Sequence, residues 1–117
     1  MKKVLGYGKV DDRGKGIIEI RDVSSKYIYV LTNEDGEILS KRQNATEITF
    51  GSIDHVVVNN RYKLYEVRGN ISDIVGDMDD VIASGSIEVS DVSSIYVPSI
   101  GDNYEVEIDR SRLNKMY

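Results

Sequence analysis

Two segments of the chain, residues 16–28 and 85–97, have closely similar sequences, and this internal repeat is the strongest constraint on the fold. They read GIIEIRDVSSKYI and GSIEVSDVSSIYV, and an alignment without gaps gives 8 identical positions out of 13. Each copy begins with alternating apolar and acidic residues, continues through Asp-Val-Ser-Ser and ends in aromatic and β-branched residues. This pattern predicts a strand, a corner and a second strand in each copy. Because repeated units fix an architecture, we expect the copies to be related by a pseudo-two-fold axis.

The whole chain, residues 1–117, predicts a single domain of the α+β class that is mostly β. Short alternating runs separated by Gly, Asn and Asp indicate a small antiparallel barrel or sandwich. One amphipathic helix is predicted over residues 71–84, with Gly85 as its C-terminal cap. Its apolar face consists of six residues at helical spacing: Ile71, Ile74, Val75, Met78, Val81 and Ile82. A further turn is predicted at residues 33–36, where Gly36 is suited to a positive φ.

The cellular location is predicted from what the composition lacks. The chain has no cysteine, which excludes disulfides and thiolate metal sites and fits a reducing compartment. The first residues include two lysines without a following apolar run, unlike a signal peptide. No apolar run approaches the roughly 20 residues that a membrane-spanning helix needs. We therefore expect a cytoplasmic protein without a membrane partner.

A glycine-rich turn contains the candidate ligand-binding residues Arg13, Gly14, Lys15 and Gly16. Successive backbone N–H groups in such a turn can form a nest for an anion, and the two cations would help to hold a phosphate. The turn lacks the Gly-Lys-Ser/Thr ending of a phosphate-binding loop before a helix. The alternative interpretation is an ordinary hairpin turn, which is what a glycine-rich turn of this kind usually forms.

Nucleic-acid binding is not expected from the opening of the chain. The run from Gly6 to Ile18 is similar to the start of cold-shock and other OB-type barrels, which stack bases on aromatic residues in the strand after the glycine turn. Here that strand has Ile17 and Ile18 at those places.

The sequence also gives little indication of catalysis, a cofactor or a metal. His55 is the single histidine, and no nucleophile-elbow motif is present, so we predict no catalytic residues and a non-enzymatic protein. Asp73, Asp77 and Asp80 share one face of the predicted helix, but that face lies opposite the apolar one. We interpret them as ordinary solvent-exposed charges, and we predict neither a metal site nor a cofactor.

Charge and tyrosine content point to contacts with other proteins. Between Arg68 and Arg110 the chain has 10 acidic residues and no basic one, in a protein whose net charge is −5. A surface with this much negative charge repels nucleic acid and attracts basic partners, although it also keeps a protein soluble. Two strands are candidates for pairing between copies: residues 104–108, whose glutamates oppose self-pairing, and the 61–68 strand. The second mixes charges of both signs with Tyr62 and Tyr65, which we predict to form a homo-oligomer interface.

These observations lead to three functional hypotheses. The first is a small binding or assembly module, homo-oligomeric and of the bacterial or phage type. The second is a protein that captures an anionic or nucleotide-like small molecule at Arg13 and Lys15. The third is an inhibitor that presents its acidic surface to a basic partner protein.

Overall fold

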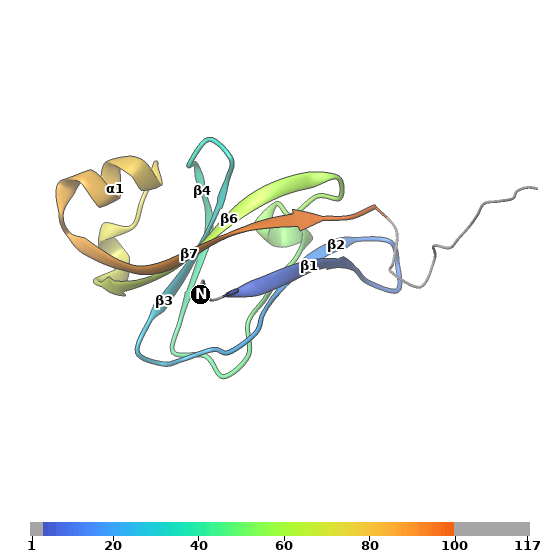
Figure 1. The fold of residues 1–117 in the computed structure, drawn as a ribbon, viewed down its shortest axis with the longest axis horizontal. Helices are drawn as coiled ribbons and strands as arrows, with labels where there is room; N and C mark the ends of the chain where they lie inside the picture. The colour runs from blue at the N-terminus through green and yellow to red at the C-terminus, as the bar shows by residue number, and fades with distance from the viewer. Residues whose placement is uncertain (1–3, 100–117) are drawn as a thin grey trace, which may run out of the picture.

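The computed structural model describes residues 4–99 of the protein, and this part of the chain is mostly β (Figure 1). The predicted mostly-β class is therefore confirmed. The elements in chain order are β1 (Gly6–Val10), β2 (Gly16–Ile20), β3 (Ile28–Asn33), β4 (Ile38–Gln43), β5 (Thr49–Phe50), the 3₁₀ turn η1 (Ser52–Asp54), β6 (Asn60–Gly69), the 3₁₀ turn η2 (Ile71–Asp73), α1 (Met78–Ser84) and β7 (Ile87–Val97).

The strands form two antiparallel sheets. The smaller has the order β1-β2-β5, and the larger has the order β4-β3-β6-β7. Neither sheet closes on itself, so the fold is not a closed barrel, and the arrangement is consistent with the predicted sandwich.

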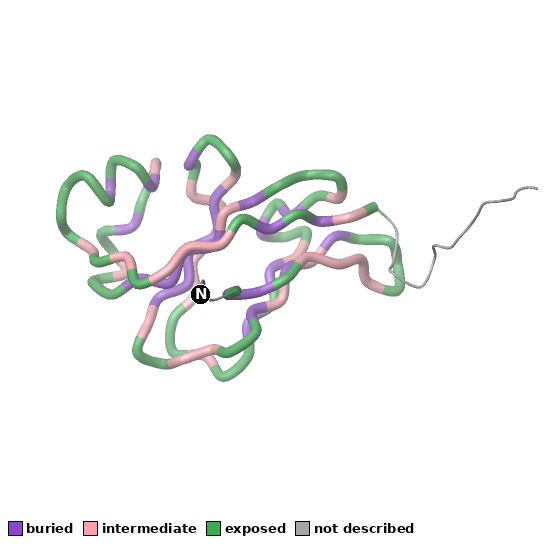
Figure 2. The backbone as a smooth tube through the Cα atoms, viewed as in Figure 1, coloured by how far each residue is buried: buried purple, intermediate pink, exposed green. Residues whose placement is uncertain are grey.

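The two central strands of the larger sheet, β3 and β6, bury both of their faces. In β3, Tyr29 and Leu31 pack into a cluster shared with the smaller sheet, whereas Ile28 and Val30 pack into a second cluster with Met78 of α1. Successive side chains of a strand point to opposite faces, so a strand covered on both sides has to be apolar throughout. Figure 2 accordingly shows buried residues concentrated in the middle of the molecule, with mainly exposed ones along α1.

Glycines allow the smaller sheet to contact the edge of β7. A Cβ atom on Gly8 would overlap the carbonyl oxygen of Tyr96, and one on Gly16 would lie 2.8 Å from a methyl group of Val97. Close approach of two backbones is one of the few reasons that a strand needs glycine. The contact continues at Leu5, whose N–H donates to the Ser93 hydroxyl at 3.0 Å.

The prediction that the two repeat copies share one conformation is wrong. Residues 16–28 form β2, a turn and the start of β3, so the chain crosses from one sheet to the other. The second copy lies in β7, one strand that is paired with β6 along its whole length. The register shifts at Ser90, opposite Glu66 and Val67, and the Asp-Val-Ser-Ser sequence that follows pairs regularly with residues 63–66 without a corner. Val23 and Val92 consequently pack against different clusters.

The predicted helix over residues 71–84 is also wrong in its extent. η2 covers only the first turn, and α1 begins at Met78 after Gly76, which has a φ of 80°. A left-handed residue cannot continue a right-handed helix, so Gly76 separates the two pieces. Asp77 caps α1 by accepting a hydrogen bond from the Asp79 N–H at 2.9 Å. The C-terminal cap is confirmed at Gly85, with a φ of 77°.

None of the helices in the described range, residues 4–99, is long and apolar enough to span a membrane. The predicted strand over residues 104–108 lies outside that range.

Candidate functional site

The glycine-rich turn between β1 and β2 binds a carboxylate of its own chain. Asp11 Oδ1 accepts hydrogen bonds from the N–H groups of Arg13 and Lys15, at 2.8 and 2.9 Å. The Gly14 N–H donates to the Asp11 carbonyl oxygen at 3.0 Å, with Gly14 at a φ of 79°. These backbone hydrogen bonds hold the pKa of the Asp11 carboxyl below its usual value. An external anion would therefore have to displace Asp11 to reach the Arg13 and Lys15 N–H groups.

The side chains of Arg13 and Lys15, by contrast, are exposed and line a hollow of about 420 Å³. Ile17 of β2 and Arg42 of β4 line the same hollow, as does Ile53 of η1. Three cationic side chains from two segments far apart in sequence thus border one surface depression. Gly14 and Gly16 do not line this hollow but the adjoining one, which Lys15 also borders.

An ion pair between the partly exposed Arg42 and the buried Asp54 fixes Arg42 and η1 in place. Arg42 Nη2 lies 2.7 Å from Asp54 Oδ1, which also accepts a hydrogen bond from the Ser40 hydroxyl at 2.6 Å. The other carboxylate oxygen of Asp54 accepts from the Gly51 N–H at 2.9 Å, and the Arg42 guanidinium lies 5.1 Å from the Phe50 ring centroid. Together these contacts fix the position of η1 relative to β4.

The pKa of Asp54 follows from the same contacts. Burial raises it, but the hydrogen bonds from Ser40, the Gly51 N–H and Arg42 outweigh burial and hold this pKa below its usual value. Asp54 therefore stays ionised at neutral pH and compensates the charge of Arg42.

Two apolar side chains next to these cations are exposed to solvent. Ile53, in η1, is 85% exposed, and Val57, just after it, is 54% exposed. Val57 borders a second hollow, of about 270 Å³, which shares Lys15 and Ser52 with the first. We call this combination the basic–apolar surface, and it consists of Arg13, Lys15, Arg42, Ile53 and Val57.

Sequence reasoning found the first two residues of the basic–apolar surface and missed the other three. A signal for Ile53 was present, since it is a lone apolar residue in the polar run Gly51-Ser52-Ile53-Asp54-His55. No sequence pattern placed Arg42 beside Arg13, because that proximity depends on how the two sheets pack.

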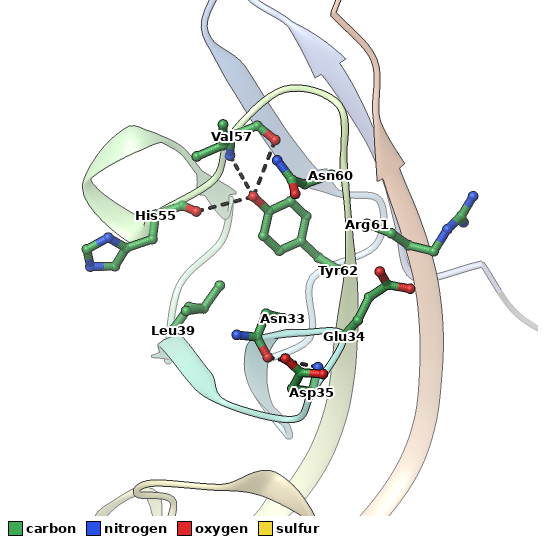
Figure 3. A pocket seen from close by; sticks show the side chains of 9 residues that line it. All are labelled: Asn33, Glu34, Asp35, Leu39, His55, Val57, Asn60, Arg61 and Tyr62. Atoms are coloured by element: carbon green, nitrogen blue, oxygen red, sulfur yellow. Dashed lines mark hydrogen bonds between the residues drawn. The ribbon is translucent and has the colours of Figure 1, made fainter.

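A third hollow, of about 370 Å³, lies between the β3–β4 turn and residues 55–60 (Figure 3). At its centre, the Tyr62 hydroxyl accepts a hydrogen bond from the Val57 N–H at 2.7 Å, and the carbonyl oxygens of His55 and Val57 lie 3.3 Å away. Figure 3 shows the His55 ring pointing away from Tyr62. The Tyr62 hydroxyl thus fixes the loop that contains Val57.

The structure contradicts the predicted interface at Tyr62 and Tyr65. Their strand, β6, is hydrogen-bonded to β3 on one side and to β7 on the other, so it has no free edge. Tyr62 is 4% exposed and Tyr65 is 5% exposed, each within an apolar cluster. Both tyrosines stabilise the core and cannot form a surface contact.

The opposite end of the molecule is acidic. Asp77, Asp79 and Asp80 surround the start of α1, and Gly36 of the β3–β4 turn lies close to the first two. Two apolar side chains are exposed beside them, Val75 at 63% and Ile82 at 38%. We call the residues Val75, Asp77, Asp79, Asp80 and Ile82 the acidic end. Within residues 4–99, no group of three His, Cys, Asp or Glu side chains is arranged to hold a metal ion.

Comparison of the chain with protein-family models, with curated proteins and with solved structures finds no match.

Proposed function

We propose that this protein is a non-enzymatic binding and assembly module, and that its basic–apolar surface receives an acidic partner surface. The main support is the position of Ile53, which is 85% exposed beside three cationic side chains. An exposed apolar side chain rimmed by charges is typical of a protein interaction site. The cations would select an acidic partner and steer its approach, while burial of Ile53 and Val57 would supply affinity.

The chemistry of the nearby titratable groups supports a non-enzymatic role. A general acid or base works best when its pKa lies near the working pH. Asp54 has a lowered pKa and is bonded to Ser40, Arg42 and the Gly51 N–H, so it is poorly suited to exchange protons at neutral pH. Its neighbour His55 lines the third hollow, with its ring turned away from Tyr62 in Figure 3.

Capture of an anionic small molecule is a second candidate function. It is favoured by the hollow of about 420 Å³ lined by Arg13, Lys15 and Arg42. The Asp11 carboxylate already occupies the backbone N–H groups of the turn, and Asp54 neutralises Arg42. A small anion would therefore rely mainly on two exposed side chains, which favours a larger acidic surface as the ligand. The third hypothesis, an inhibitor of a basic protein, would instead use the acidic end.

Fluorescence anisotropy with two labelled peptides, one of alternating Glu and Val and one of alternating Lys and Val, tests the proposal. We expect the acidic peptide alone to bind at low salt. The double variant Arg13→Ala/Lys15→Ala should weaken binding by about fivefold, which corresponds to about 1 kcal/mol for two exposed charges. Lys26→Ala is the matched control, because Lys26 is an exposed lysine in the β2–β3 connection. It should leave the affinity unchanged.

Competition by inorganic pyrophosphate distinguishes the two candidate functions. Displacement of the acidic peptide at low pyrophosphate concentration, with a rise in Tm, would favour the small-molecule function. An acidic peptide that fails to bind, or that binds equally well to the Arg13/Lys15 variant, would contradict the assembly proposal.

A further inference from the structure

We infer that the acidic partner of the basic–apolar surface is the acidic end of a second copy of this chain, so that the protein assembles head to tail. This inference rests on the function proposed above and names its partner. It replaces the predicted pairing through Tyr62 and Tyr65, which the burial of both residues excludes.

Charge complementarity is the first argument. The acidic end has Asp77, Asp79 and Asp80 within four consecutive residues, and the sequence has no basic residue from position 69 to position 109. Lys41 approaches this region, but its ammonium group donates to the carbonyl oxygens of Ile71 and Ile74, at 3.0 and 2.7 Å. The basic–apolar surface offers Arg13 and Lys15, both exposed, as opposing charges.

The apolar side chains at the two surfaces are the second argument. Ile82 lies on α1, but the helix uses Met78 and Val81 to contact the core, which leaves Ile82 partly exposed. Val75 is exposed because the left-handed Gly76 turns the chain just before α1. Contact with Ile53 and Val57 of another copy would remove these side chains from water and so stabilise the association.

The positions of the two surfaces determine the symmetry of the assembly. In Figure 1, α1 lies at one end of the molecule and the turn between β1 and β2 lies at the other. A contact between different surfaces of identical chains is heterologous, so each added copy leaves one surface of either kind unoccupied. Such a contact produces a ring when the rotation between copies closes, and a filament when it does not.

Two one-sided variants test this symmetry. The basic-side variant combines Lys15→Ala with Ile53→Ser, and the acidic-side variant combines Asp79→Asn with Ile82→Ser. All four side chains are at least partly exposed, and circular dichroism with a Tm measurement confirms that each variant is folded. By sedimentation velocity at about 0.05 M NaCl, wild type should associate, and about 0.5 M NaCl should reverse the association by screening. Each variant alone should require at least about tenfold more protein to associate.

The mixture of the two variants gives the decisive result. One variant keeps the acidic end and the other keeps the basic–apolar surface, so together they retain one complete contact. We expect an equimolar mixture to form a one-to-one heterodimer and nothing larger. A mixture that remains monomeric while wild type associates would overturn the head-to-tail arrangement.

Two further outcomes separate this inference from the proposed function. If wild type stays monomeric at every concentration but still binds the acidic peptide, the partner is not a second copy of the chain. The proposed binding of an acidic partner would then still stand. The double variant Glu105→Ala/Glu107→Ala should associate like wild type. Loss of association in that variant would assign the contact to residues 104–108 and would also overturn the inference.

Discussion

Replacement of Tyr29 by phenylalanine tests how the centre of the larger sheet is stabilised. Tyr29 is completely buried, and its hydroxyl donates to Glu66 Oε2 at 3.0 Å while accepting a hydrogen bond from the Ser24 N–H at 3.0 Å. Glu66 is 1% exposed, so the bond links a neutral donor to a buried carboxyl group. A hydrogen bond to a charged group contributes about 1.5–3 kcal/mol. Glu66 has other interactions as well, so the variant would not leave its carboxyl group without a partner. We therefore expect Tyr29→Phe to lower the free energy of unfolding by about 2 kcal/mol, within that range.

Urea denaturation at pH 7 measures this loss, and Tyr65→Phe is the matched control. Tyr65 is also buried, and it neighbours Glu66 in β6 but points to the opposite face. Its hydroxyl makes no hydrogen bond within residues 4–99, so its removal should cost under about 1 kcal/mol. Equal losses in the two variants would refute the assignment of stability to the Tyr29–Glu66 bond.

The buried phenol of Tyr29 should also make the protein less stable in alkali. Burial raises the pKa of Tyr29 to about 12, assisted by the Glu66 carboxylate and opposed by the Ser24 N–H. The native state therefore disfavours the ionised phenol, and its contribution is complete below the unfolded pKa of about 10. The free energy of unfolding should fall by about 1.4 kcal/mol at pH 11 and about 2.3 kcal/mol at pH 12. Tyr29→Phe should remove this part of the fall in the free energy of unfolding above about pH 10. The same pH profile in wild type and variant would contradict the prediction.

Three further predictions concern the sheet contact, the helix cap and the ion pair between Arg42 and Asp54. Gly8→Ala should lower the free energy of unfolding by about 2 kcal/mol, measured in urea, because its Cβ would overlap the Tyr96 carbonyl oxygen. Asp77→Ala should cost about 1 kcal/mol through loss of the helix cap, and Asp77→Asn should restore most of it. Because the pKa of Asp54 is lowered in the folded state, its ionised carboxylate stabilises the fold above about pH 4. This stabilisation is lost as the pH falls and Asp54 becomes protonated. Asp54→Asn should therefore flatten the acid side of the stability profile and, by weakening the bond to Arg42, destabilise the protein at pH 7.

The sequence by itself determined the features that depend on a residue and its immediate neighbours. The turn at residues 33–36 has its glycine at a φ of 91°, and Gly85 ends α1 in a left-handed conformation, both as predicted. These positions can be read from sequence because only glycine adopts such angles without strain. The apolar run of β3 is typical of a central strand, because a strand covered on both faces is apolar on both.

Only the tertiary structure decided which strands are edges and which side chains are exposed. Two similar sequences became a turn at residues 21–27 and a continuous strand in β7, because β7 has β6 as a partner along its whole length. Tyr62 was predicted at an interface, but β6 is paired on both sides and the Tyr62 side chain packs in an apolar cluster. The basic–apolar surface likewise depends on Arg42 and η1, which the buried Asp54 carboxylate holds beside the β1–β2 turn. Local propensity is weak compared with the energy of packing and pairing, so these contacts, distant in sequence, determined the outcome.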